Sequence, residues 1–386
     1  MAKKNLMALR RMHGAVHEWN EVRKEQQHLK NLIKTGRKKS LEREKEVAHI
    51  TEDYPVDIVV TWVDGSDPAW QAERNKYMPN ASSKLDTVDA RFREWGIFQY
   101  WFRAVEKYAP WVNHVYLVTW GHVPSWLNMN NPKLKVVKHS EFIPEEYLPT
   151  FSSHTIEMNL WRIPGLSEHF IYFNDDMFLM KKVEKSDFFC NGLPKYCAIA
   201  KPMFTFLNMN SHRHARLNNF GIVNAYFDIH QCIEDHPEKW FNYKYYDDVK
   251  YNVRVYEDKF ICGMHYFHVG LPFRKSTMKD FSEHYPERVR RTCLNRFRTS
   301  DDYMHQIFQM WDIFHGNFEP VESNYYGRLF SVTKDSVEYA VEVILNGNDR
   351  MICINDHEGV DDLVKIKERI YKALEQKFPE KSSFEN

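Results

Sequence analysis

The sequence has no excess of charge of either sign, because 53 Lys and Arg residues balance 53 Asp and Glu residues. A net charge of zero argues against nucleic acid as the main partner. No apolar run approaches the roughly 20 residues that span a bilayer. The first residues, MAKKNLMALRRMHG, turn charged too early for the apolar core of a signal peptide. These absences predict a cytoplasmic protein.

Paired cysteine motifs are also missing. The six cysteines are scattered, without CxxC or metal-finger spacing, which predicts free thiols in a reducing compartment. The chain is 43% hydrophobic and 15% aromatic, so it is globular. Its 386 residues suffice for one large domain or two ordinary ones.

The balanced total conceals a basic N-terminal segment. Residues 1–47 hold 13 Lys and Arg but only 6 Asp and Glu, a local charge of +7, and they contain no proline. Apolar residues roughly follow one helical face from Leu6 to Ile33. We expect a helical arm over residues 1–50. It either lies peripherally on an anionic membrane or is a solvated or oligomerising helix.

Beyond Pro55, apolar runs alternate with helical patterns. The predicted strands lie around residues 56–62, 114–121, 133–139, 170–173 and 350–355. Alternation of this kind predicts an α/β fold with a mainly parallel, Rossmann-like sheet and helices on both faces. In such sheets, ligands bind beyond the carboxyl ends of the strands.

Acidic clusters close three of these strands. They are Asp64 with Asp67, Asn174-Asp175-Asp176, and Asn355-Asp356. Adjacent carboxylates in apolar surroundings are costly unless a cation or donors neutralise them. Their oxygens suit Mg²⁺ or Mn²⁺, so the predicted metal ligands are Asp175, Asp176, Asn355 and Asp356. The alternative is that each Asp only caps a helix or closes a turn.

At four places the sequence resembles the conserved regions of the Stealth family. DIVVTWVDGSDP resembles the first region, and the stretch from RFREWG to FIYFNDD resembles the second. HVGLPFRKS with RFRTSDDY resembles the third, and ICINDHEG resembles the fourth. The resemblance spans roughly residues 55–360.

Stealth proteins are hexose-1-phosphate transferases of bacterial capsules and of animal lysosomal enzyme tagging. The resemblance implies a GT-A-like fold, a UDP-sugar donor, a divalent metal and a phosphodiester product. We expect the bacterial branch, which would move an N-acetylhexosamine-1-phosphate to a hydroxyl of a polysaccharide or lipid-linked glycan and release UMP. The implied partners also include the inner membrane or the capsule assembly machinery, but no nucleic acid. Two other classes stay open: a metal-dependent glycosyltransferase that releases UDP, and a non-catalytic sugar-binding module.

The resemblance also implies roles for individual residues. The expected catalytic residues are His268, Arg298, Asp67 and Asp176. The expected substrate-binding residues are Trp62, Asp64, Gly65, Arg91, Arg103, Ser152, Ser153, Glu157, Asn174 and Lys275.

Phosphoryl transfer explains these residue types. Cations must surround a phosphate whose charge spreads in the transition state, and arginine grips phosphate with two donors. A general base must accept the acceptor's proton, and histidine suits neutral pH. Some family members carry a second histidine where this chain has Leu271, so Asp67 or Asp176 is the reserve base.

Two further segments complete the expected organisation. Residues 51–360 form the catalytic domain, within which the aromatic-rich and Asn-rich segment 190–262 forms an insert or lid over the acceptor. Most of its aromatics are expected in the core. Residues 361–386 form a packing helix, because Leu363, Ile366, Ile370 and Leu374 share one helical face.

Overall fold

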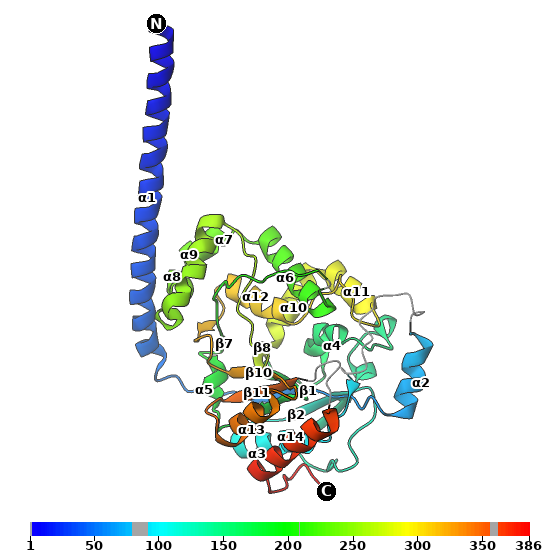
Figure 1. Ribbon diagram of the computed structural model, residues 1–386. Coiled ribbons are helices and arrows are strands. Elements are labelled where there is room, and N and C mark those ends of the chain that lie inside the picture. The colour runs from blue at the N-terminus through cyan, green and yellow to red at the C-terminus, as the bar shows by residue number, and fades with distance from the viewer. Residues whose placement is uncertain (1, 79–91, 208, 356–361) are drawn as a thin grey trace.

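A five-stranded sheet forms the centre of the molecule (Figure 1). The computed structural model describes residues 2–78, 92–207, 209–355 and 362–386. The strands in spatial order are β3 (Leu134–Lys138), β2 (Val115–Thr119), β1 (Val56–Thr61), β4 (His169–Asn174) and β8 (Leu271–Arg274). The first four run parallel, and β8 pairs antiparallel to β4. The predicted α/β fold with a mainly parallel, Rossmann-like sheet is therefore confirmed.

The central strands are apolar because helices cover both faces of the sheet. All residues of β2 are buried, and only Thr61 of β1 is partly exposed. Asp57 lies buried in β1, where its carboxylate accepts hydrogen bonds from the amides of His114 and Ser167 and from Asn113 Nδ2. This carboxylate fixes the loops at the amino ends of the strands, opposite the edge where ligands are expected.

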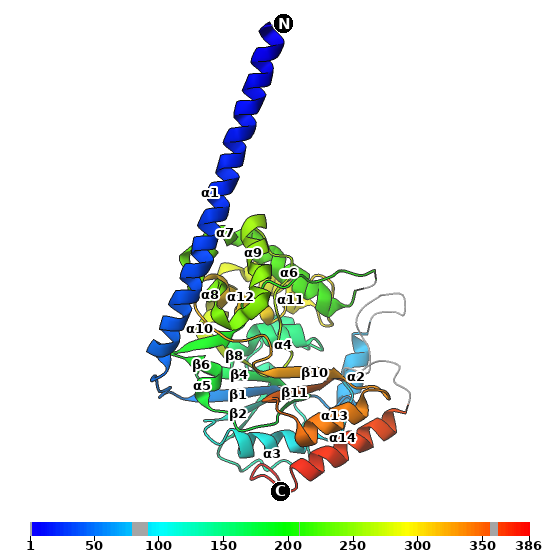
Figure 2. The ribbon, with the colours of Figure 1, turned by 60° about the vertical axis from the view of Figure 1, so that its left-hand side comes forward.

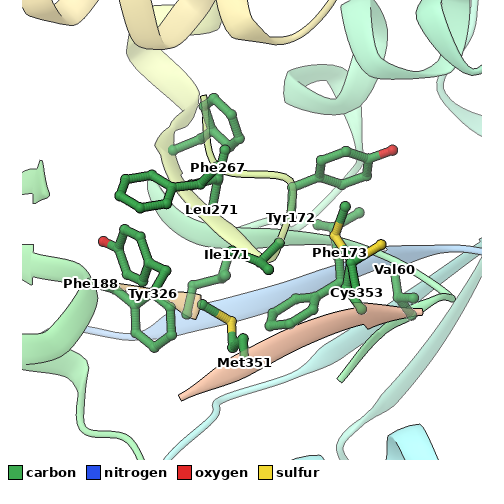
Figure 3. Packing of buried hydrophobic residues seen from close by; sticks show 14 of the residues in the cluster. Val60, Ile171, Tyr172, Phe173, Phe188, Phe267, Leu271, Tyr326, Met351 and Cys353 are labelled. Carbon is green, nitrogen blue, oxygen red and sulfur yellow. The ribbon is translucent and has the colours of Figure 1, made fainter. Parts of the chain in front are cut away.

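The fifth predicted strand exists as β11 (Met351–Asn355), but it lies outside the central sheet. It pairs parallel to β10 (Gly327–Ser331) and antiparallel to β5 (Met177–Leu179). The expectation that it extends the central sheet is therefore wrong. β5 follows β4 after a two-residue turn, so the second sheet branches from the carboxyl end of β4. Figure 3 shows that Phe173, Leu271 and Met351 from the two sheets pack into one apolar cluster.

Helices lie on both sides of this framework (Figures 1 and 2). On one side are α3 (Phe98–Tyr108), α13 (Val337–Asn346) and α14 (Leu363–Lys377). α14 buries Ile366, Ile370 and Leu374 and packs on α13. On the other side are α4 (Ser153–Asn159), α10 (Lys275–His284), α11 (Pro286–Leu294) and α12 (Gln306–Phe314). α2 (Pro68–Lys76) follows the loop after β1.

Residues 190–262 form much of the layer farthest from α14. A third sheet joins β6 (Phe189–Cys190), β7 (Leu193–Tyr196) and β9 (Glu319–Pro320). The helices are α6 (Ser211–Tyr226), α7 (Ile229–Asp235), α8 (Pro237–Trp240) and α9 (Val249–Asp258), and a short α5 (Lys185–Phe188) precedes them. α6 packs on α12, which ties this layer to the helices that cover the central sheet.

The predicted N-terminal helix is present as α1 (Ala2–Val47). Its carboxyl-terminal part packs on α8, where Leu29 and Ser40 are buried. Its amino-terminal part extends beyond the body of the molecule, and Trp19 and Val22 are exposed there (Figure 1). Among the described residues, no helix is both long and apolar enough to cross a membrane.

Gly36 permits the close contact between α1 and α8. A Cβ at this position would lie 2.3 Å from the carbonyl oxygen of Pro237 and 3.1 Å from Phe241 Cβ. Real Cβ atoms do not approach a backbone oxygen so closely. A larger residue must therefore push α1 away from the body.

We expect Gly36→Ala to destabilise the protein by about 1–3 kcal/mol, the usual cost of overpacking. Gly221→Ala is the matched control, because Gly221 also lies within a helix but its Cβ would meet nothing within 4 Å. The control should be neutral or stabilising by about 1 kcal/mol. Urea unfolding of both variants tests this, and equal midpoints would show that α1 does not pack as described.

Candidate active site

The carboxyl end of β4 carries the acidic turn. Asn174 ends β4, and Asp175 and Asp176 form the turn into β5. The backbone N–H of Ile354 in β11 donates to the Asp176 carbonyl at 2.8 Å. The Tyr172 hydroxyl donates to Asn174 Oδ1 at 2.8 Å, which orients that amide. The turn is thus held between the central sheet and the second sheet.

Both carboxyls of this turn are electrostatically strained. Burial raises the pKa of Asp176 to about 6, although a hydrogen bond from Cys353 opposes part of the rise. Burial and the negative charges of Asp176 and Glu94 raise the pKa of Asp175 well above its usual range. Asp176 Oδ1 is buried and has no hydrogen-bond partner within the described part of the chain. A cation at this point would satisfy the free oxygen and favour ionised carboxylates.

The residues beside Asp176 fit a metal ion. Ligand atoms of Asp176, His268 and Cys353 all lie within 4.8 Å of one another. However, burial and the adjacent Asp176 raise the pKa of the Cys353 thiol well above its ordinary value, so it stays protonated. Its sulfur lies 3.2 Å from Asp176 Oδ2 and acts as a hydrogen-bond donor there. The arrangement therefore favours a hard cation on oxygen ligands over a soft cation on sulfur.

Two of the four predicted metal ligands belong to β11 and the loop after it. Asn355 is the last residue of β11, next to the strand position that contacts Asp176. Asp356 lies outside the described residues. The end of β11 therefore lies beside the turn that contains Asp176, although the two belong to different sheets and not to one sheet edge.

His268 lies in the loop before β8 and faces this acidic turn. Burial lowers its pKa to about 4, and the charges of His305 and Arg298 add to this effect, whereas Glu157 opposes it. The imidazole is thus neutral near pH 7 and can accept a proton. A free imidazole has a pKa near neutrality, and burial of His268 is the main reason for the difference.

A second polar group joins α4 to the loop after α11. Arg298 Nη2 donates to Ser153 Oγ at 2.5 Å, and Ser153 Oγ donates to Glu157 Oε1 at 3.0 Å. His305 Nδ1 lies 2.9 Å from Glu157 Oε2, and Tyr266 contacts His305 Nε2 at 3.0 Å. Burial alone would raise the pKa of Glu157, but the charges of His305, His154 and Arg298 hold it well below the usual range.

Asp302 fixes the loop that carries Arg298. It is fully buried, and it accepts hydrogen bonds from the Thr299 amide at 2.9 Å, the Thr299 hydroxyl at 2.8 Å and Asn295 Nδ2 at 2.7 Å. His154 Nδ1 lies 3.0 Å from Asp302 Oδ2, the oxygen that also accepts from the Thr299 amide. Asp302, His305 and Cys353 are members of the site that no sequence pattern identified. Asp302 was within reach, because it stands in the RFRTSDDY motif.

The loop after β1 has the contacts of a turn. Asp67 caps α2 by accepting from the Trp70 amide at 2.7 Å, and Asp64 accepts from the amide and hydroxyl of Ser66. A Cβ at Gly65 would lie 2.1 Å from the Phe92 carbonyl, so this approach requires glycine. Trp62 is buried and donates from Nε1 to Glu94 at 3.1 Å. Substrate or catalytic roles for Trp62, Asp64, Gly65 and Asp67 stay predictions.

The remaining predicted residues have contacts elsewhere. Arg103 is clamped by both oxygens of Glu385, at 2.8 and 2.6 Å. Lys275 Nζ donates to the Leu166 carbonyl at 3.3 Å, and Ser152 is buried before α4. Their substrate roles stay predictions, and the contacts of Arg103 are those of a structural ion pair. Arg91 lies outside the described residues.

Comparison with known proteins supplies independent information. Models of the Stealth protein conserved regions match this chain at residues 54–82 (region CR1), 91–196 (CR2) and 267–306 (CR3). The resemblance at residues 352–359 stays a prediction.

Curated relatives cover nearly the whole chain. The capsular polysaccharide phosphotransferase WcwK of Streptococcus pneumoniae is 38% identical over 86% of this chain and 98% of its own length. The receptor polysaccharide phosphotransferase WefC of Streptococcus oralis is 38% identical over 86% of this chain and 99% of its own length. The exopolysaccharide phosphotransferase cps2G of Lactiplantibacillus plantarum is 36% identical over 86% of this chain and 96% of its own length. Among solved structures, the galactosyltransferase LgtC is 10% identical with a TM-score of 0.34, over 83% of this chain and 95% of that chain, a likeness too weak to support inference.

The charge of Glu157 gives the first prediction for the site. Glu157→Gln should destabilise the protein at pH 7 by about 1–3 kcal/mol, because it removes the buried carboxylate that accepts hydrogen bonds from the Ser153 hydroxyl and the His305 amide. Glu146→Gln is the control, since its exposed pair with Arg290 should contribute at most about 1 kcal/mol.

The same pair of variants predicts a pH dependence. A depressed folded-state pKa means that the contribution of Glu157 is complete above its unfolded pKa of about 4.3 and declines as the pH falls below it. The stability difference between wild type and Glu157→Gln should therefore shrink on acidification. Urea unfolding from pH 7 to pH 3 measures it, and a difference that stays constant would contradict the assigned ionisation.

The second prediction distinguishes a metal ion bound by the Asp176 carboxylate from one bound by the Cys353 thiol. Asp176→Asn should weaken Mn²⁺ binding by about 100-fold or more. Even the mutation of a residue that only hydrogen-bonds to a metal ligand lowers metal affinity by about 10–100-fold. Cys353→Ser keeps a hydrogen-bond donor to Asp176, so it should change Mn²⁺ affinity by less than about threefold. Calorimetric titration of the three proteins with Mn²⁺ tests this. A large loss in Cys353→Ser would instead identify the thiol as a ligand.

Proposed function

The chain belongs to the Stealth family, and we propose that it transfers a hexose-1-phosphate from a UDP-sugar to a hydroxyl of a bacterial surface polysaccharide. The observation that carries this proposal is the placement of the neutral His268 imidazole beside Asp176 of the acidic turn, within the electrostatic reach of the Arg298 guanidinium. These are an anionic metal-binding surface, a proton acceptor and a fixed positive charge. Transfer of a phosphoryl group requires all three.

His268 is the proposed general base. Its pKa of about 4 leaves the ring unprotonated at pH 7, so a proton from the acceptor hydroxyl can move to it. The low pKa also makes His268 a weak base. A weak base suffices here, because the acceptor hydroxyl becomes acidic as its oxygen bonds to phosphorus, and its proton moves at that stage. Asp67 and Asp176 are the reserve candidates, although Asp67 already accepts a hydrogen bond from Trp70.

Arg298 is proposed to bind the transferring phosphate. The contact with Ser153 occupies one of its terminal nitrogens, and the Asp302-fixed loop restricts its motion. A guanidinium held in this way need not reorganise as phosphate charge redistributes. Asp175 and Asp176 would hold a divalent cation, Mg²⁺ or Mn²⁺, that neutralises the donor's diphosphate.

The names of the relatives support a surface-polysaccharide acceptor, because the three cited are phosphotransferases of capsular, receptor or extracellular polysaccharide. We propose an N-acetylhexosamine as the donated sugar and UMP as the leaving group. The insert 190–262 would cover the acceptor. The enzyme would act in the cytoplasm, with peripheral contact to the inner membrane or the assembly machinery.

A metal-dependent glycosyltransferase that releases UDP is the second candidate. The Asn174-Asp175-Asp176 turn favours it, because a strand-end acid pair could serve either reaction by holding a nucleotide-bound cation. The two reactions differ in the atom that the acceptor attacks, which is phosphorus in the first and the anomeric carbon in the second.

We expect His268→Ala to lower kcat by about 10²–10⁴, since a general base contributes this much. Arg298→Ala should lower kcat by about 10²–10³, the usual cost of one preorganised donor at a developing charge. The measurement is turnover of a UDP-sugar panel with an oligosaccharide acceptor, with the products identified by phosphorus NMR.

Arg288→Ala is the matched control, because Arg288 is an exposed arginine on nearby α11, and it should keep full activity. Wild-type product should contain a sugar–phosphate–sugar linkage beside free UMP. Accumulation of UDP with a phosphorus-free product would overturn the phosphotransferase proposal and support the second candidate.

A further inference from the structure

An exposed apolar segment precedes α6. Phe204, Phe206 and Leu207 are 75%, 61% and 92% exposed, although they stand within four residues of one another. The segment extends past the neighbouring helices in Figure 2. Scattered exposed apolar residues are ordinary, but a cluster at a projecting tip is a mark of an interaction surface.

The segment that carries this tip has basic residues and no acidic ones. From residue 201 to residue 227 the chain contains no Asp or Glu, and Lys201 and Arg213 flank the tip. Lys201 is exposed at the start of the segment. Arg213 lies over the Phe206 ring at 4.9 Å and donates to the Phe204 carbonyl at 3.4 Å, so a guanidinium is attached to the apolar tip itself. A partner with both apolar and anionic groups fits this tip.

The tip is connected directly to the active site. Asn210 caps α6 by accepting from the Arg213 amide at 3.0 Å, which fixes the junction between segment and helix. His212, in the first turn of α6, has its ring centre 6.0 Å from that of His268. The helix that follows the apolar tip thus carries His212 into contact with the proposed general base.

We propose that Phe204, Phe206 and Leu207 insert into an anionic membrane surface and thereby bring the active site to a lipid-linked acceptor. The identity of the acceptor rests on the proposed function, whereas the membrane contact does not. Aromatic and leucine side chains enter the boundary between headgroups and acyl chains, and adjacent Lys and Arg contact anionic headgroups. Sugar stacking fits less well, because Leu207 has no aromatic face and Arg213 covers one face of Phe206.

The experiment is flotation of the full chain with vesicles of phosphatidylcholine, with and without phosphatidylglycerol. Wild type should float with the anionic vesicles. Phe204→Ser/Phe206→Ser/Leu207→Ser should reduce partitioning on the order of 100-fold, because three apolar side chains lose their burial. Lys201→Glu/Arg213→Glu should reduce it more than about tenfold on anionic vesicles, and added salt should mimic this effect.

Two control variants locate the contact. Tyr339→Ser/Val364→Ser removes exposed apolar residues from α13 and α14, on the other side of the molecule, and should float like wild type. Trp19→Ser/Val22→Ser tests α1, and it should retain most of the binding. Equal thermal unfolding of all variants would show that each is folded.

Several outcomes would overturn this inference. They are no flotation of wild type, unchanged flotation of the triple variant, an equal loss in the α13–α14 control, or loss only in the α1 variant. Weaker binding of a soluble oligosaccharide to the triple variant, without vesicle binding by wild type, would assign the tip to sugar stacking instead. Because flotation needs no turnover, a failed phosphotransferase assay would leave its result intact.

Discussion

The desolvation of two adjacent carboxyls at the turn after β4 is the constraint on which the site depends. Burial raises the pKa of both Asp175 and Asp176, so the fold holds them ionised only with help from positive charge or hydrogen-bond donors. The Cys353 thiol donates to Asp176 Oδ2, whereas Asp176 Oδ1 has no hydrogen-bond partner among the described residues. A protein keeps such a turn at a stability cost when a cation and an anionic ligand complete it.

The two-sheet construction explains how the other groups reach this turn. β5 continues the chain immediately after the acids and pairs with β11, which brings Cys353 beside Asp176. β8 pairs with the other edge of β4, which brings the loop containing His268 to the same place. α4 and the Asp302-fixed loop then add the positive charge of Arg298. These segments are far apart in the sequence. They meet because β8 pairs with β4 and β11 pairs with β5, the strand that follows β4.

The sequence predicted where the strands lie better than it predicted which strands pair and which side chains meet. Apolar runs identified β1 to β4 and β11, since continuous burial leaves a plain pattern, but they could not show that β11 pairs with β5. Only three residues make up β5, and they read as a continuation of β4. Motif resemblance selected Asp176 and His268, which the structure places side by side, and Arg298, Ser153 and Glu157, which it joins in one hydrogen-bonded group. It missed His305 and Cys353, whose importance lies in tertiary contacts. It also could not foresee that Arg103 pairs with Glu385, 282 positions away.

The central claim is that this site directs attack at phosphorus. A UDP-sugar labelled with ¹⁸O in the bridge between the anomeric carbon and phosphorus tests it most directly, with the products read by mass spectrometry. Attack at phosphorus leaves the carbon–oxygen bond intact, so the account predicts that the label stays in the sugar–phosphate product and that the released UMP is unlabelled. Label released in the nucleotide would show cleavage of the anomeric carbon–oxygen bond and would contradict the account.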